Sequence, residues 1–265
     1  MSKQYRHIYQ KKFGQNFLKS KKIIKKILHL LNINPKDKTI EIGPGLGAIT
    51  KYLLKKLNQL IAIDIDKTIQ KPLLKLPYSN KLKLIIKNAL DIDYSQWGKN
   101  LHIVGNLPYN ISIQLLIYLI KYKKFISTMH FMIQKEVALR LIASPSSKKY
   151  GQLTIIMQYN YRIQYLFTVK PENFSPKPKV TSSMIKLIPY SHPLSKTTDY
   201  LLLNKVIKKA FSTRRKTLLN NFKPILKQQH FIKLQINPKL RPEQIDINDY
   251  IKITNFIKKY SIQCH

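Results

Sequence analysis

Residues 39 to 47 read Thr-Ile-Glu-Ile-Gly-Pro-Gly-Leu-Gly, a short apolar run that leads into a glycine-rich turn. A helical pattern begins at Gly47, so this stretch predicts a strand, a tight loop and a helix in succession. Glycine lacks a Cβ atom, and it therefore lets the backbone turn sharply and approach a ligand closely. The stretch indicates a nucleotide-like cofactor bound at the first strand of an α/β fold.

The glycine loop alone leaves the identity of the cofactor open. Gly43, Gly45 and Ala48 satisfy the dinucleotide pattern G-x-G-x-x-G/A, so the loop does not separate a nicotinamide dinucleotide from S-adenosylmethionine. Asp64 ends the next apolar run, 17 residues after Gly47. Its carboxylate can accept hydrogen bonds from ribose hydroxyls, which both cofactors carry.

Short apolar runs and helical patterns alternate on either side of this loop. An amphipathic helix is expected over residues 20–31. The expected strands are residues 39–42, 60–63, 82–86, 101–104 and 129–133, and the expected helices begin at Gly47 or span residues 67–76, 112–122 and 134–143. This alternation predicts a parallel sheet with helices on both faces.

A linker is expected at residues 189–199, where prolines and small polar residues gather. Beyond it the pattern is only helical. We therefore expect a catalytic α/β domain of residues 1–190 and a small all-helical domain of residues 191–265.

Residues 105 to 110 read Gly-Asn-Leu-Pro-Tyr-Asn and follow the fourth expected strand. An amine on an aromatic ring is a poor nucleophile, so a site that methylates it needs acceptors for its N–H groups and a flat surface for the ring. The side-chain carbonyl of Asn106 and a backbone carbonyl held by the rigid Leu107–Pro108 bond can be the acceptors, and the ring of Tyr109 can be the surface. A proline turn at a strand end is the simpler interpretation of the tetrad alone. Together with the glycine loop, however, the tetrad favours methyl transfer from S-adenosylmethionine over hydride transfer.

Composition narrows the class of partner. The net charge is +36, with 48 basic and 12 acidic residues, which favours a polyanion and nucleic acid before a membrane surface. Only six of the basic residues are Arg, however, and a biased nucleotide composition would enrich Lys without selection for binding. Cys264 is the only cysteine, so no intrachain disulfide is possible, and the histidines lack metal-ligand spacing. We expect a cytoplasmic protein without a metal ion and without a membrane segment.

With these motifs, the chain resembles the small-subunit ribosomal RNA adenine N6,N6-dimethyltransferase family over nearly its whole length. The motifs that carry the resemblance occur in one order: Phe13-Gly-Gln-Asn-Phe-Leu18, Glu41-Ile-Gly-Pro-Gly-Leu-Gly47, Gly105-Asn-Leu-Pro-Tyr-Asn-Ile-Ser112, Met132-Ile-Gln-Lys-Glu-Val-Ala138, Tyr150-Gly151, Phe174-Ser-Pro-Lys-Pro-Lys-Val180 and Phe211-Ser-Thr-Arg-Arg-Lys-Thr-Leu218.

The resemblance implies a Rossmann-like class I S-adenosylmethionine-dependent methyltransferase sheet, followed by a small helical domain that binds rRNA and the ribosome. It implies a monomer that dimethylates the N6 amines of two adjacent adenines near the 3′ end of 16S-type rRNA, on the small ribosomal subunit, during its biogenesis. The implied cofactor contacts are Asn16, Leu18, Gly43, Asp64, Asn88 and Asn106, the implied catalytic residues are Asn106, Leu107, Pro108 and Tyr109, and the implied RNA contacts are Arg214, Arg215 and Lys216.

Two positions depart from the family pattern. Asn88 stands where the family usually has an Asp that binds the cofactor's adenine amine, so we expect the contact to persist without its charge. Asp91 could replace it if the loop is shifted. Lys177 stands where proline is more usual, although Pro176 and Pro178 should keep that loop stiff.

Three other functions are compatible with parts of this pattern. A methylase of large-subunit rRNA would share the tetrad, but it usually has Ile in place of Leu107 and lacks the Phe13-Gly14 start. A DNA adenine methylase would normally have an acidic first tetrad residue or a separate recognition domain. A non-enzymatic assembly factor could bind the immature small subunit through charge alone.

Overall fold

The computed structural model describes residues 16–191 and 199–262. It divides into two compact units, the first made of residues 1–138 and 164–189 and the second of residues 139–163 and 190–265. The second unit thus takes in a segment from the middle of the chain. The separation of function between a catalytic domain of residues 1–190 and a helical domain of residues 191–265 stays a prediction.

The first unit is built on a seven-stranded sheet with the strand order β4-β3-β2-β5-β6-β9-β7. Its strands are β2 (Thr39–Ile42), β3 (Leu60–Asp64), β4 (Leu82–Ile86), β5 (Leu101–Asn106), β6 (Ile126–Gln134), β7 (Tyr161–Val169) and β9 (Ser182–Pro189). The strands from β4 through β6 pair in parallel, whereas β9 runs antiparallel to β6. The expected strands are confirmed and the fold is α/β. The prediction of a parallel sheet is wrong in one respect, because the antiparallel strand β9 makes the sheet mixed.

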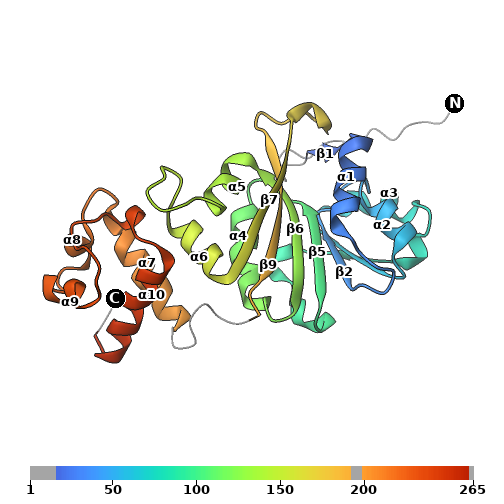
Figure 1. The fold of residues 1–265 in the computed structure, drawn as a ribbon. Helices are drawn as coiled ribbons and strands as arrows, with labels where there is room; N and C mark the ends of the chain where they lie inside the picture. Colours follow the sequence, from blue (N-terminus) through green and yellow to red (C-terminus); the bar gives the residue numbers. More distant parts are fainter. Residues whose placement is uncertain (1–15, 192–198, 263–265) are drawn as a thin grey trace. The chain divides into compact units, whose positions relative to one another are not determined.

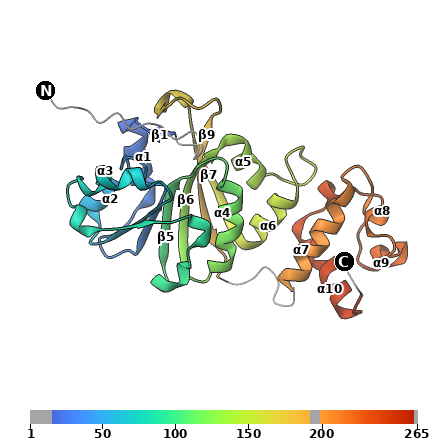
Figure 2. The ribbon, with the colours of Figure 1, turned by 180° about the vertical axis from the view of Figure 1, so that it is seen from behind.

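Helices cover both faces of this sheet. They are α1 (Lys21–Leu31), α2 (Thr50–Lys56), α3 (Gln70–Leu74), α4 (Ser112–Leu119) and α5 (Lys135–Leu141). Figures 1 and 2 show α1 and α2 on one face and α4 on the other. The helix expected over residues 20–31 is confirmed in α1: the Ser20 side chain caps its first turn, and Ile24, Ile27 and Leu31 are buried.

A second, two-stranded sheet joins segments far apart in the sequence. In it β1 (Phe17–Leu18) pairs antiparallel with β8 (Phe174–Ser175), with Phe17 opposite Ser175. The backbone N–H of Lys19 donates to the carbonyl of Asn173 at 2.9 Å and extends this pairing. The pairing holds the chain before α1 against the loop between β7 and β9.

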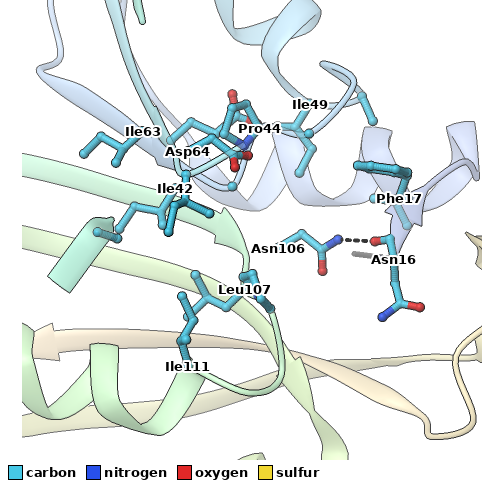
Figure 3. A pocket seen from close by; sticks show the side chains of 18 of the residues that line it. Asn16, Phe17, Ile42, Pro44, Ile49, Ile63, Asp64, Asn106, Leu107 and Ile111 are labelled. Atoms are coloured by element: carbon cyan, nitrogen blue, oxygen red, sulfur yellow. Dashed lines mark hydrogen bonds between the residues drawn. The ribbon is translucent and has the colours of Figure 1, made fainter. Parts of the chain in front are cut away.

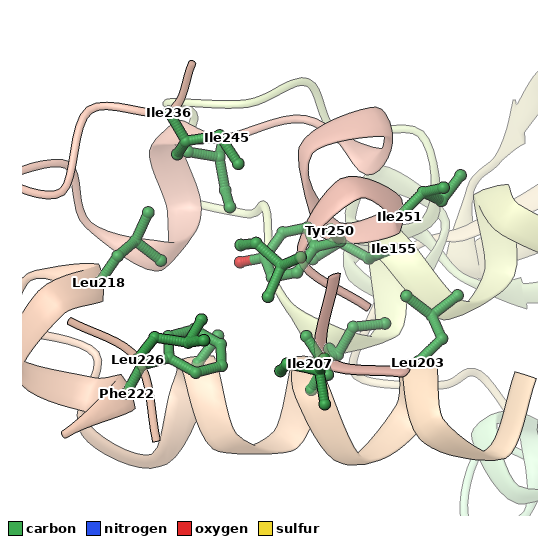
Figure 4. Close-up of a cluster of buried hydrophobic side chains, with 14 of the residues drawn as sticks. Ile155, Leu203, Ile207, Leu218, Phe222, Leu226, Ile236, Ile245, Tyr250 and Ile251 are labelled. Carbon is green, nitrogen blue, oxygen red and sulfur yellow. The ribbon is translucent and has the colours of Figure 1, made fainter. Parts of the chain in front are cut away.

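The second unit has a core of its own. Its helices are α6 (Gln152–Asn160), α7 (Tyr200–Ala210), α8 (Leu218–Phe222), α9 (Gln228–Lys233) and α10 (Ile247–Lys259). Figure 4 shows Ile155 of α6 among the buried side chains of the C-terminal helices, including Leu203, Ile207 and Tyr250. Within the described ranges, no helix has the length and apolar character needed to cross a bilayer.

Candidate active site

A pocket opens at the carboxyl ends of β2, β3, β4 and β5, where open α/β sheets bind their ligands. Figure 3 shows Asn106 bonded to Asn16 on one side of it and Asp64 on the other side. The predicted cofactor and catalytic residues all line this pocket: Asn16, Leu18, Gly43, Asp64, Asn88, Asn106, Leu107, Pro108 and Tyr109. Residues 13–15 of the N-terminal motif lie outside the described residues.

The glycine loop lies against two other walls of the pocket. Gly43 has φ +69, and a Cβ atom there would lie 3.3 Å from the backbone oxygen of Asn106. Gly45 has φ +52, and a Cβ atom there would lie 2.7 Å from the ring of Phe17. L side chains rarely adopt such φ values, so both positions require glycine for conformation as well as for space.

Asp64 presents a partly desolvated carboxylate at the end of β3. Its Oδ1 accepts a hydrogen bond from the backbone N–H of Asp66 at 2.9 Å. Burial raises the pKa of Asp64, while backbone N–H groups of Asp66 and Gly45 oppose the rise. The side chain is therefore held in place as an acceptor, which suits the hydroxyls of a ribose.

Glu41 also lines the pocket and is absent from the predicted site. It is only 2% exposed, and its Oε2 has no hydrogen-bond partner among the described residues. Burial raises its pKa to about 7, Thr50 opposes the rise, and the charge of Asp64 adds to it. The signal in the sequence was an acidic residue inside the apolar run 39–42, where a carboxylate is costly unless a ligand uses it.

Asn88 borders the pocket after β4, whereas Asp91 is exposed and is not among the residues that line it. The Oδ1 of Asn88 accepts from the backbone N–H of Leu90 at 3.1 Å. This bond fixes the side chain at the start of a short 3₁₀ turn, and the amide keeps a second lone pair on its oxygen. The geometry favours Asn88 over Asp91 as a pocket residue.

The tetrad is tied to the rest of the pocket by directed hydrogen bonds. The Nδ2 of Asn106 donates to the backbone carbonyl of Asn16 at 2.7 Å, the contact drawn in Figure 3. The N–H of Leu107 donates to the carbonyl of Met132 on β6 at 3.0 Å, and the Leu107 side chain is buried. The Asn106 amide and the Leu107 peptide therefore have fixed orientations.

Tyr109 is half-buried and is bonded at both ends. Its hydroxyl lies 2.7 Å from the Oγ of Ser182, and its backbone carbonyl accepts from the Oγ of Ser112 at 3.2 Å. Burial raises the pKa of the Tyr109 phenol, and the hydrogen bond with Ser182 opposes the rise. The ring therefore has a defined direction at the edge of the pocket.

The predicted RNA-binding triplet lies in the second unit, where all three side chains are exposed. Arg214 is engaged within that unit: its Nη2 donates to the carbonyl of Lys148 at 3.0 Å, and its Nε lies 3.5 Å from Glu243. Arg214 therefore has a structural role in addition to any contact with RNA. For Arg215 and Lys216 the prediction remains that they contact phosphates of the RNA.

The chain is similar over most of its length to proteins of one family. Residues 6–259 match the family model described as ribosomal RNA adenine dimethylase. A protein of Legionella pneumophila (strain Corby) named "Ribosomal RNA small subunit methyltransferase A" is 48% identical over 253 residues, covering 95% of this chain and 99% of the relative. The protein of the same name from Nitrosospira multiformis is 40% identical, covering 96% and 98%.

Two solved structures share the fold over most of the chain. A dimethyladenosine transferase from Plasmodium falciparum superposes with a TM-score of 0.81 at 27% identity, covering 94% of this chain and all of the other. The 23S rRNA methyltransferase ErmE superposes with a TM-score of 0.73 at 18% identity, covering 92% of this chain and all of the other, a likeness of fold alone.

Proposed function

The chain belongs to the ribosomal RNA adenine dimethylase family, and from this premise we propose that it dimethylates small-subunit rRNA. The reaction transfers methyl groups from S-adenosylmethionine to the N6 amines of two adjacent adenines near the 3′ end of 16S-type rRNA. The relatives named for the small subunit favour that subunit over the large one as the partner. We expect the enzyme to act as a monomer in the cytoplasm and to take part in assembly of the subunit.

The residues at the carboxyl ends of β2 and β3 fit the methyl donor. The glycine loop has positive φ values at Gly43 and Gly45, and its backbone can come close to a ligand. Asp64 supplies an acceptor for ribose hydroxyls, and the buried carboxyl of Glu41 can face the ammonium of the methionine portion. When bound, S-adenosylmethionine supplies an electrophilic methyl group.

Asn106 and Leu107 are placed to bind the amine that is methylated. Because the Nδ2 of Asn106 is committed to the Asn16 carbonyl, its Oδ1 is left to accept an N–H of the amine. The Leu107 carbonyl, in the rigid peptide bond to Pro108, offers a second acceptor, and the bond from the Leu107 N–H to the Met132 carbonyl anchors the residue to β6. Two acceptors orient the nitrogen lone pair toward the methyl group, which is the main requirement for a direct displacement.

Tyr109 offers the surface on which an extruded adenine can stack. Stacking on an aromatic ring contributes roughly 1–3 kcal/mol per base, which offsets much of the few kcal/mol lost on unstacking. No strong base is needed before transfer, because the attacking amine is neutral and becomes acidic only after it gains the methyl group. Its proton can then pass to water through the acceptors already in place. Dimethylation repeats the step on the monomethylated amine after exchange of the donor.

The observation that carries this proposal is the fixed amide of Asn106 beside the glycine loop. In transfer of labelled methyl groups to small subunits that lack the modification, we expect Asn106→Ala to be roughly 10²–10³-fold slower than the parent, by analogy with loss of one oriented polar group. Asn248→Ala, at an exposed position of α10, is the matched control and should transfer at the parent rate.

Three other outcomes would contradict the proposal, each in a different part. Equal rates for Asn106→Ala and the parent would remove Asn106 from the catalytic machinery. Binding of small subunits without transfer by the parent would favour the non-enzymatic assembly factor. Transfer to large subunits in place of small ones would favour the alternative rRNA substrate.

A further inference from the structure

Strand β9 begins with two consecutive serines that are both fully buried, Ser182 and Ser183. Each is hydrogen-bonded to the hydroxyl of a tyrosine: Ser182 to Tyr109 at 2.7 Å and Ser183 to Tyr165 at 2.8 Å. Neighbouring residues of a strand point to opposite faces of the sheet. Both bonds join a serine to a tyrosine, but the Tyr165 hydroxyl also bonds to the hydroxyl of Thr168, and only Ser182 contacts a residue of the pocket.

We propose that Ser182 is a positioning residue of the methyl-transfer reaction, acting through the ring of Tyr109. The inference rests on the proposed function, because it assigns the ring to the target adenine. Tyr109 lies in the loop after β5, where the bond from Ser112 holds only its backbone. The bond to Ser182 fixes the other end of the side chain, so the long axis of the ring cannot swing about χ1 without breaking it.

Ser182 is itself held rigidly. It faces Gln134 in the β6–β9 ladder, and the residue before it accepts a hydrogen bond from the N–H of Lys135 at 2.9 Å. The ring of Tyr109 is thus anchored to the central sheet through Ser182. The same sheet also holds Leu107 through Met132. The stacking surface and one amine acceptor share a single rigid support.

This arrangement matters because displacement at the methyl group demands accurate placement of the amine. A shift of about 1 Å at a reacting group can cost on the order of 10²-fold in rate. Without Ser182 the Tyr109 hydroxyl would be half-buried with no partner from β9, so the ring would move to satisfy it. Adenine would still stack, but the amine would be placed less precisely.

The test compares Ser182→Ala with Ser183→Ala, since each removes one partly buried serine–tyrosine hydrogen bond from β9. For Ser182→Ala we expect kcat on small subunits to fall about tenfold, while KM for the subunits and the affinity for S-adenosylmethionine stay within twofold. For Ser183→Ala we expect kcat to be unchanged, with a loss of melting temperature no larger than that of Ser182→Ala, because Tyr165 keeps its bond to Thr168.

A double-mutant cycle with Tyr109→Phe adds a readout that a merely structural role would not move. Tyr109→Phe keeps the aromatic surface and removes the same hydrogen bond from its other end, so the double variant should be no slower than the slower single variant. Independent, multiplying losses would overturn the inference, as would equal slowing by Ser183→Ala or a parent-like kcat for Ser182→Ala. If the parent itself methylates no small subunits, it is the proposed function that fails.

Discussion

Glu41 shows how a single residue can make cofactor binding depend on pH. Its pKa is raised to about 7 by burial, and it lines the pocket. A ligand with an ammonium group binds better to the charged form, so affinity for S-adenosylmethionine should rise roughly tenfold from pH 5.5 to 7 as Glu41 ionises. Titration calorimetry across this range should show that the rise is absent in Glu41→Gln. A parallel rise in both proteins would mean that Glu41 does not face the ammonium.

His130 on β6 makes the stability of the fold depend on pH. It is 2% exposed, its Nε2 has no partner among the described residues, and burial lowers its pKa to about 4, with the charges of Lys186 and His102 adding to the shift. Because the unfolded chain binds this proton more readily, His130 contributes stability above pH 6.5 and loses it as the pH falls toward 4.

The change that tests this is His130→Gln, which removes the titrating ring. Urea unfolding at pH 6.5 and 4.5 should show a smaller loss of stability in the variant than in the parent, by about 2 kcal/mol. His29→Gln, at an exposed position of α1, is the control and should follow the parent. Identical pH dependence in all three proteins would contradict the assignment.

At the scale of elements, the close approach of β5 to β2 brings the tetrad to the glycine loop. A Cβ atom on Gly105 would lie 2.5 Å from the backbone oxygen of Ile42 and 3.0 Å from the Leu107 side chain. Gly105→Ala must therefore push the two strands apart directly before Asn106, at a cost of about 1–3 kcal/mol.

Thermal unfolding should show a melting temperature lower by about 3–10 °C for Gly105→Ala, with a fall in methyl transfer that exceeds the loss of folded protein. Gly151→Ser is the matched control, because a Cβ atom at Gly151 meets nothing within 4 Å and serine suits the start of α6. A Gly105→Ala protein as stable and active as the parent would show that the strands tolerate separation here.

Some of these elements can be predicted from local sequence patterns and others cannot. The parallel strands and α1 were predictable because their apolar pattern is local, and the strands at 39–42 and 82–86 match the prediction at both ends. The antiparallel β9 and the β1–β8 pairing were not predictable, since both depend on partners distant in sequence. The contact of Ser182 with Tyr109 was not predictable for the same reason, because the two residues are 73 positions apart.

At the scale of the whole molecule, the second unit depends on a segment from the middle of the chain. Tyr150, Ile155 and Tyr159 belong to its buried core, and the ring of Tyr159 stacks on Tyr200 with centroids 6.0 Å apart. A fragment of residues 191–265 lacks these side chains. We therefore expect it to unfold without a cooperative transition, measured by circular dichroism on heating.

Joining residues 139–163 to residues 190–265 through a short flexible linker should restore a cooperative transition. A cooperative transition in the shorter fragment alone would show that the C-terminal helices form an independent domain, as the prediction of a helical domain of residues 191–265 requires.

The central claim is that this pocket dimethylates adenine in small-subunit rRNA, and the product tests it most directly. Small subunits lacking the modification are incubated with the protein and S-adenosylmethionine, and the rRNA is then hydrolysed and mapped by mass spectrometry. The account predicts N6,N6-dimethyladenosine at two adjacent positions near the 3′ end, with large subunits unmodified. Methylation confined to large-subunit RNA, or a product that is never dimethylated, would contradict it.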